Sequence, residues 1–210
     1  MKLLNTLQDL FPNASLTQIE DFNFIFKKYR KIFGITNRLQ ADLFLSQIRV
    51  EVGSSMRNRR ENMNYSCKSL KRTFKFYRKN PTSARRDGRC QGHRADKKRI
   101  ANNAYRNRLG NFKKNDGWDF RGGGFIQLTG RGNYEKITST INTVLGINIT
   151  TQEIQQKISE TQMGLLTALA YWYQRGIYKC GTPKCCTKKV NRYTDTYTLR
   201  KKYFLLLQSL

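Results

Sequence analysis

The stretch Arg38–Val52 reads RLQADLFLSQIRVEV, and its large apolar side chains recur at helical spacing. These apolar residues are Leu39, Leu43, Phe44, Ile48 and Val52. A period close to 3.6 residues predicts an amphipathic helix with these side chains on its buried stripe. Glu51 then falls near the C-terminal end of the helix, where its carboxylate can face a cleft.

The same spacing recurs on both sides of this stretch, so we expect a chain built mainly of helices. Further helices are predicted over residues 15–31, 97–108, 152–157, 161–175 and 198–207. Ser15 followed by Gln18 is typical of a capping box. The basic stretch 69–99 contains few large aliphatic residues, which favours short helices joined by loops. Strand signals are scarce, and the predicted fold class is mainly α.

The chain has 210 residues, of which 40 are Lys or Arg and 14 are Asp or Glu, giving a formal net charge of +26. This length allows one folding unit with a sizeable core. Residues 57–114 hold 20 of the basic residues and only three acidic ones, so we expect one basic face and an anionic partner. Nucleic acid is the main rival partner. However, helix-turn-helix cues, zinc-finger spacing and RNA-binding strand signatures are all missing, so no specific nucleic acid is expected.

Five cysteines are present, and the odd number with an adjacent Cys185-Cys186 pair favours free thiols. A bridge from Cys180 to Cys185 or Cys186 is the alternative. The single histidine, His93, leaves few ligand combinations for zinc, and we expect no metal or cofactor. Polar residues interrupt the first residues, and no apolar run could span a bilayer, so no cleaved signal peptide or transmembrane segment is expected.

Residues 118–134 read WDFRGGGFIQLTGRGNY and place glycines around Gln127, Thr129 and Asn133. Glycine lets a backbone lie close to a ligand while amide and hydroxyl groups point at it. A mobile surface turn is the alternative for a glycine run. The spacing matches neither of the phosphate-binding glycine motifs, which disfavours nucleotide binding.

Two carboxylates, Glu51 and Glu61, lie ten residues apart and are separated by a Gly-Ser-Ser turn that can fold the chain back. Such a pair is the minimum requirement for glycoside hydrolysis, in which one group protonates the leaving oxygen and the other activates water or attacks carbon. The alternative is that both groups pair with the neighbouring arginines Arg57, Arg59 and Arg60.

Four blocks together resemble glycoside hydrolase family 19, the chitinases and related bacterial and phage endolysins. They are QIRVE at 47–51, ENMNYS at 61–66, IANNAYRNRLGN at 100–111 and the block at 116–134. The resemblance covers roughly residues 38–200. It implies a lysozyme-like, two-lobed helical domain over residues 37–210 with a central glycan-binding cleft. Residues 1–36 are expected to form a helical segment of the same unit, and the protein to be a monomer.

The resemblance also implies roles for individual residues. Glu51 matches the general acid, Glu61 matches the general base, and Thr129 matches a hydroxyl residue that holds the attacking water. In an inverting enzyme the two carboxyls lie roughly 6.5 to 9.5 Å apart. Glu51 should be shielded so that it holds a proton, and Glu61 should stay ionised. The matching or candidate substrate-binding residues are Gln127, Asn133, Asn191, Tyr65, Tyr105, Trp118 and Tyr134, although each aromatic ring could instead belong to the core.

The sequence departs from the family pattern at several positions. Val50 replaces a histidine, Gly123 replaces an arginine, and Arg192 and Tyr193 replace glycines that follow the late asparagine, which weakens the match of Asn191. The expected activity is hydrolysis of β-1,4 links in an N-acetylglucosamine polymer. The charge favours peptidoglycan in an anionic bacterial envelope. The alternatives are a chitinase and an inactive glycan- or polyanion-binding protein. Without a signal peptide, a wall hydrolase would be made in the cytoplasm and act on the wall after release or dedicated export.

Overall fold

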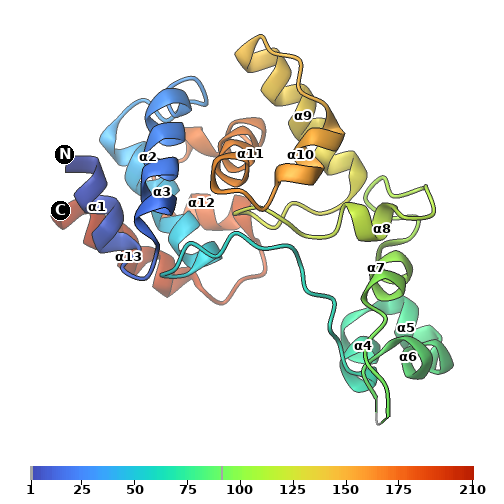
Figure 1. The fold of residues 1–210 in the computed structure, drawn as a ribbon. Coiled ribbons are helices and arrows are strands. Elements are labelled where there is room, and N and C mark those ends of the chain that lie inside the picture. The colour runs from blue at the N-terminus through green and yellow to red at the C-terminus, as the bar shows by residue number, and fades with distance from the viewer. Residues whose placement is uncertain (1, 91) are drawn as a thin grey trace. The chain divides into compact units, whose positions relative to one another are not determined.

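The structure is a computed structural model that describes residues 2–90 and 92–210. In these residues the chain folds into α-helices, one short 3-10 helix and connecting loops, without a β-strand (Figure 1). The predicted mainly helical fold class is therefore confirmed, and it is consistent with a lysozyme-like architecture. The chain divides into two compact units, which are described separately.

Unit 1 comprises Met1–Arg59, Gly124–Ile126 and Ile137–Leu210. Its helices are α1 (Lys2–Leu10), α2 (Leu16–Tyr29), α3 (Arg38–Val52), α10 (Thr151–Lys157), α11 (Thr161–Gln174), η1 (Ile177–Lys179), α12 (Pro183–Val190) and α13 (Tyr197–Ser209), with the later part of α9 (Arg131–Leu145). Ser15 and Gln18 form the predicted capping box at the start of α2.

Helix α3 has the bounds that the sequence predicts. Its first turn is capped by Asn37, whose side chain accepts a hydrogen bond from the Gln40 N–H at 2.9 Å. It ends at Gly53, where φ is 72°, a conformation that favours glycine. Phe44 and Ile48 are buried as predicted, but Leu39 is 40% exposed. The prediction that Leu39 lies on the buried stripe is wrong, because the first turn of α3 is covered on fewer sides than the middle.

A row of aromatic rings forms the centre of unit 1. Phe22 contacts Phe26 at 5.7 Å between ring centroids, Phe26 contacts Phe44 at 5.6 Å, and Phe44 contacts Trp172 at 5.2 Å. Because Phe22 and Phe26 come from α2, the first 36 residues contribute directly to the core of this unit. The C-terminal helix α13 packs along α3.

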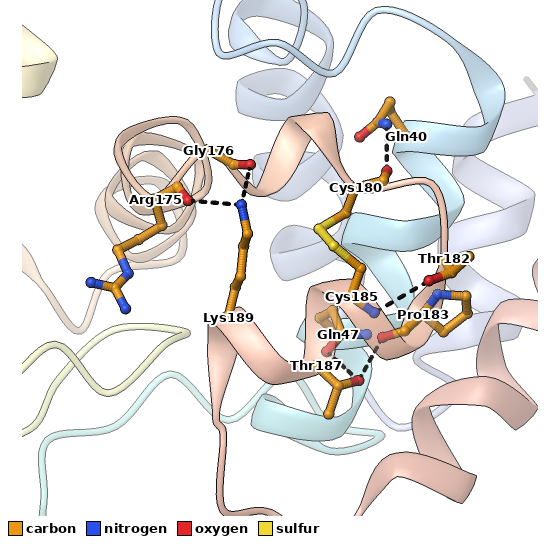
Figure 2. The surroundings of a disulfide bond; sticks show 10 residues. All are labelled: Gln40, Gln47, Arg175, Gly176, Cys180, Thr182, Pro183, Cys185, Thr187 and Lys189. Carbon is orange, nitrogen blue, oxygen red and sulfur yellow. Dashed lines mark hydrogen bonds between the residues drawn. A yellow bond between two sulfur atoms is a disulfide. The ribbon is translucent and has the colours of Figure 1, made fainter.

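Four of the five cysteines form disulfides, so the preference for free thiols is wrong. Cys180 is joined to Cys185 with 5.6 Å between their Cα atoms (Figure 2), and Cys67 is joined to Cys90 with 5.8 Å. Cys186 is buried and free, and burial raises the pKa of its thiol to about 12. Successive residues of α12 point in different directions, which lets Cys185 reach Cys180 while Cys186 faces the core.

The disulfide of unit 1 lies among hydrogen bonds that tie α12 to its surroundings (Figure 2). The Cys180 carbonyl accepts a hydrogen bond from Gln40 Nε2 on α3 at 2.9 Å. The Thr182 side chain caps α12 by accepting from the Cys185 N–H at 3.3 Å. Lys189 donates to the Gly176 carbonyl at 2.9 Å. These contacts hold both ends of α12, and thus Thr187 between them.

Unit 2 comprises Arg60–Gly123 and Gln127–Lys136. Its helices are α4 (Cys67–Thr73), α5 (Lys75–Lys79), α6 (Pro81–Asp87), α7 (Lys97–Tyr105) and α8 (Asp116–Asp119), with the first residues of α9. The predicted short helices of the basic stretch are therefore present. A small apolar core includes Met63, Leu70, Phe74, Tyr77 and Ile100.

Buried carboxylates organise unit 2 around hydrogen bonds. Asp87 accepts from Tyr77 Oη at 2.9 Å, Arg86 Nε at 2.7 Å and Asn103 Nδ2 at 2.9 Å. Burial alone would raise the pKa of Asp87, but these donors and the Arg86 charge lower it below its ordinary value. Asp116 pairs with Arg131 at 2.6 Å. The Asn103 hydrogen bond ties α7 to α6, and the Asp116–Arg131 pair ties α8 to the start of α9.

We expect unit 2 to lose stability at alkaline pH because its tyrosines are buried. Burial is the largest cause that raises the pKa of Tyr65, Tyr77, Tyr105 and Tyr134, the last to about 12. The folded state therefore keeps these protons above pH 10, where tyrosines of the unfolded chain ionise. For Tyr134 alone, the free energy of unfolding should be unaffected below about pH 9 and fall by about 2 kcal/mol between pH 10 and 12.

Urea unfolding followed by circular dichroism across this range measures the effect. Tyr134→Phe should flatten the profile, whereas Tyr193→Phe, at a residue that is 92% exposed, should leave it unchanged. Identical profiles for Tyr134→Phe and the wild type would contradict the prediction.

No helix among the described residues is both long enough and apolar enough to cross a membrane.

Candidate active site

The backbone of Glu61 is fixed in unit 2 by the glycine-rich segment. Its N–H donates to the Gly122 carbonyl at 2.7 Å, and its own carbonyl accepts from Arg121 Nε at 3.1 Å. A hollow of about 190 Å³ lined by residues 61–65 lies beside it. A hollow of this size has room for water, whose share of liquid volume is about 30 Å³ per molecule.

Two tyrosine hydroxyls hold the Glu61 carboxylate, one on each oxygen. Tyr65 donates to Oε1 at 3.3 Å and Tyr105 donates to Oε2 at 2.7 Å. Both rings pack edge-on against Phe74, with centroids 5.1 Å and 6.0 Å away. Burial, reinforced by Glu61, raises the pKa of both tyrosines, which therefore remain protonated donors. The two hydroxyl donors, one on each oxygen, hold the Glu61 carboxyl group in one orientation.

Gly122 brings three of the predicted site residues together. A Cβ atom at this position would lie 2.9 Å from Gln127 Oε1, 3.3 Å from Thr129 Oγ1 and 3.4 Å from Glu61 Cβ. Paired hydrogen bonds between Gly123 and Leu128, at 3.1 and 2.7 Å, close the turn, and Gln127 has a positive φ of 50°. Within unit 2, the glycine-rich segment thus lies beside Glu61. A side chain at 122 would require the Gln127 amide to move, and Thr129 to shift slightly.

Thr129 and Asn133 are partly committed to the backbone. Thr129 Oγ1 donates to the Gln127 carbonyl at 2.8 Å, which leaves its oxygen lone pairs to accept from water or a sugar hydroxyl. Asn133 Nδ2 donates to the Thr129 carbonyl at 2.7 Å. Its Oδ1 has no partner among the described residues and can accept a hydrogen bond.

The aromatic candidates differ in how accessible their rings are. Tyr134 is fully buried and packs on Phe120, so its ring belongs to the core. Trp118 is partly buried, and the Arg121 guanidinium lies 3.6 Å from the centroid of its ring. A sugar could stack only on the ring face that Arg121 leaves uncovered. Tyr65 and Tyr105 use their hydroxyls to hold Glu61, and their contact with substrate stays a prediction.

In unit 1, Glu51 forms an ion pair with a buried arginine of α13. Arg200 Nη2 donates to Glu51 Oε1 at 2.5 Å, and the Arg200 side chain is 2% exposed while that of Glu51 is 21% exposed. Glu51 Oε2 receives no hydrogen bond from the described residues. The alternative pairing of Glu51 with Arg57, Arg59 or Arg60 is not the one the structure has.

Gln47 and Thr187 complete the surroundings of Arg200. Gln47 Oε1 accepts from Arg200 Nη1 at 2.8 Å and from Thr187 Oγ1 at 3.4 Å, and Arg200 Nε donates to Thr196 Oγ1 at 3.1 Å. The sequence reasoning missed the roles of Gln47 and Arg200. Gln47 precedes Glu51 by four residues, so helical spacing could have indicated it. Arg200 carries no comparable local signal.

Asn191 ends α12 in unit 1 and is exposed. Its backbone N–H donates to the Thr187 carbonyl at 2.8 Å, and its Oδ1 accepts from the Tyr193 N–H at 3.2 Å. The predicted role of Asn191 in substrate binding is untested by this geometry. Among residues 2–90 and 92–210, no cluster of three or more His, Cys, Asp or Glu side chains is arranged to hold a metal ion.

Comparison with known proteins decides the family. No protein-family model matches the chain. A protein of Haemophilus influenzae described as a glycosyl hydrolase family 19 domain-containing protein is 32% identical over 160 residues, which cover 75% of this chain and 73% of the relative. The chain belongs to glycoside hydrolase family 19. The resemblance seen in the sequence blocks is thereby confirmed.

Membership of family 19 supports a glycosidase-type function, with a polysaccharide as the class of substrate. Within this family 19 chain, unit 2 supplies Glu61, Gln127 and Thr129 around Gly122, and unit 1 supplies Glu51 beside Arg200. The separation of the two carboxyls stays a prediction.

Proposed function

We propose that this family 19 protein is an inverting glycoside hydrolase that cleaves β-1,4 links in an N-acetylglucosamine-containing polymer, with bacterial peptidoglycan as the substrate. Glu51 acts as the general acid and Glu61 as the general base. Thr129 helps to hold the attacking water, and the amides of Gln127 and Asn133 bind the acetamido and hydroxyl groups of the sugars.

The observation that carries this proposal is the environment of Glu61. A carboxylate that accepts from two tyrosine hydroxyls, at 2.7 and 3.3 Å, is held in one orientation. A general base must be ionised and must have a water within reach, and the adjoining hollow of about 190 Å³ provides space for that water. Thr129, gathered beside the same glycine, supplies a second group to orient it.

If Glu51 is the general acid, only one of its two oxygens is available to carry the proton. Oε1 is occupied by the Arg200 ion pair, so the proton for the leaving oxygen must be carried by Oε2. The proposal requires that bound glycan covers the Glu51 side chain, which is 21% exposed, and meets Oε2 with its leaving oxygen.

The charge of the chain supports peptidoglycan over chitin. Chitin is neutral, whereas bacterial walls carry peptide carboxylates, and a protein of net charge +26 is attracted to them over long range. The proposed site of action is the cell wall, which the protein would reach after release or dedicated export. Chitin hydrolysis is the second candidate, because both polymers share the bond that the two carboxylates would cleave.

Turbidity loss of purified peptidoglycan, with mass spectrometry of the products, tests the proposal. Chitin oligomers are assayed in parallel, and Glu51→Gln serves as the catalytic blank. We expect the wild type alone to release muropeptides, and NMR of the first products to show the inverted anomer. Cleavage of chitin alone would replace the proposed substrate, and retention of the anomeric configuration would refute the mechanism. Absence of cleavage of either polymer would refute the enzyme assignment.

A further inference from the structure

Unit 2 has two adjoining hollows whose walls are strongly basic. The first, of about 630 Å³, is lined by Lys98, Arg99, Lys113 and Lys114 among others. The second, of about 670 Å³, is lined by Lys75, Lys79 and Arg108 among others. Asn103, Arg106 and Asn107 line both hollows, so the two meet at the end of α7. We call these two hollows together the basic groove.

The positive charge of the basic groove is almost unopposed. Asp96 is the one carboxylate among its lining residues, and it is already paired with Arg99 at 3.3 Å. The groove's other lysines and arginines make no ion pair with the described residues, and all of these side chains are exposed. Like charges gathered around one hollow repel each other, and an anionic ligand removes that repulsion. The groove is therefore suited to a ligand with repeated negative charges.

Helix α7 has one face toward the core of unit 2 and the other toward the basic groove. Ile100, Ala101 and Ala104 face inward, whereas Lys98, Asn102 and Arg106 recur four residues apart on the outer face. Gly117 lets α8 approach α7 closely, since a Cβ there would lie 2.5 Å from the Ala101 carbonyl. The groove is thus a shaped feature of the fold, and its floor is formed by packed backbone.

The groove is joined to the Glu61 site through consecutive residues of the chain. Tyr105 donates a hydrogen bond from its hydroxyl to Glu61, and Arg106, the next residue, is one of the three that line both hollows. The charge of Arg108, which lines the second hollow, also acts on the Tyr105 hydroxyl, although burial and Glu61 still leave the pKa of Tyr105 raised. A polymer bound at Glu61 would therefore have its anionic substituents in reach of this unit's basic face.

We propose that the basic groove binds the carboxylate-bearing stem peptides of peptidoglycan, and so selects this wall polymer over neutral chitin. This inference rests on the proposed function. Besides its cations, the groove presents the side-chain amide of Asn107, which makes no hydrogen bond with the described residues and can pair with peptide N–H and C=O groups in both directions. The amides of Asn102 and Asn103 are partly used within the fold, since Asn102 Oδ1 accepts from the Trp118 N–H and Asn103 Nδ2 donates to Asp87. Its cations supply the partners for the carboxylates.

The groove lacks the row of stacking rings that binds single-stranded nucleic acid. Phe112 is 79% exposed at the first hollow, but Phe76 at the second packs edge-on against Tyr77, with 5.0 Å between centroids. One free ring does not make a base-stacking platform. The combination of amides and cations is better matched to acidic peptides than to nucleotides.

Binding to insoluble peptidoglycan tests the proposal without depending on turnover. All proteins carry Glu61→Gln, so that the polymer is not consumed. The test variant adds Lys79→Gln, Arg106→Gln and Lys113→Gln. Lys113 lines the first hollow, Lys79 lines the second, and Arg106 lines both. The control variant adds Lys31→Gln, Lys201→Gln and Lys202→Gln, three exposed lysines of unit 1, and has the same net charge. Sedimentation measures the affinity for intact peptidoglycan and for glycan strands stripped of stem peptides by an amidase.

We expect the test variant to bind intact peptidoglycan about tenfold more weakly than the control variant. Each exposed ion pair contributes up to about a fivefold change in the dissociation constant, and three are removed. Both variants should bind stripped strands equally. Equal binding of the two variants to intact peptidoglycan would overturn the inference. So would tighter binding of a single-stranded DNA oligonucleotide, lost in the test variant alone, because it would assign the groove to nucleic acid. Failure of the proposed function is registered separately, by the absence of cleavage with Glu61 intact.

Discussion

Replacing Glu61 by glutamine should lower kcat on peptidoglycan by about 10²- to 10⁴-fold, the range that a positioned general base contributes. Glutamine has nearly the same shape; its amide oxygen can accept from one of the two tyrosine hydroxyls, and its NH2 group can donate to the oxygen of the other, so the site should largely keep its geometry. It cannot take a proton from water. The loss should therefore appear in kcat, with little change in KM or in the free energy of unfolding.

Substitutions of the two tyrosines test whether the hydrogen bonds that hold Glu61 contribute to catalysis, because they leave the carboxyl group itself in place. Tyr105→Phe removes the 2.7 Å hydrogen bond and should lower kcat by about tenfold, the equivalent of one hydrogen bond to a charged group. Tyr65→Phe removes the longer, 3.3 Å bond and should cost less. Tyr193→Phe, at an exposed ring, is the matched control. If Glu61→Gln retained activity within tenfold of the wild type, the general base would have to be another residue.

Local signals in the sequence were enough to predict α2, α3, α7, α10, α11 and α13, but α1, α8, α9 and α12 were not predicted. The bounds of α3 follow from an apolar stripe, an asparagine at the N-cap and a glycine at the C-cap, all within residues 37–53. The start of α2 follows from Ser15 and Gln18. By contrast, α9 (Arg131–Leu145) was not predicted, because its first residues belong to the glycine-rich segment and its threonines and β-branched residues do not favour a helix.

Contacts between distant residues had no such signal. The glycine-rich segment and Glu61 were associated only through the family resemblance, whereas the close approach of Gln127 and Thr129 to Gly122 is seen only in the structure. The disulfides depend on Cα atoms brought within 5.8 Å by the fold, which cysteine spacing cannot reveal. The partner of Glu51 lies 149 residues away on α13. A composition with 40 basic residues offers too many candidates for that partner.

Arg200→Met should destabilise unit 1 by about 3 kcal/mol, near the lower end of the range for breaking a buried ion pair. Methionine fills much of the space but leaves Glu51 without its cation and Gln47 Oε1 with only the 3.4 Å bond from Thr187. The lower end applies because Glu51 is 21% exposed and can be partly solvated. Urea unfolding measures the change in free energy.

Substitution of the other partner of the ion pair, Glu51→Gln, should lower the free energy of unfolding by less. The glutamine oxygen still accepts from Arg200, and the guanidinium keeps Gln47 and Thr196 as acceptors. In the double variant, Arg200→Met should cost less than it does alone, because no unpaired carboxylate remains at position 51. Arg200→Lys is the test of geometry: one ammonium group cannot reproduce three separately directed nitrogens, so part of the stability should be lost although the charge remains. A change of less than about 0.5 kcal/mol for Arg200→Met would mean that the ion pair does not hold α13 against α3. In that case Glu51 would be free to reorient, and its orientation for catalysis would have to come from bound substrate.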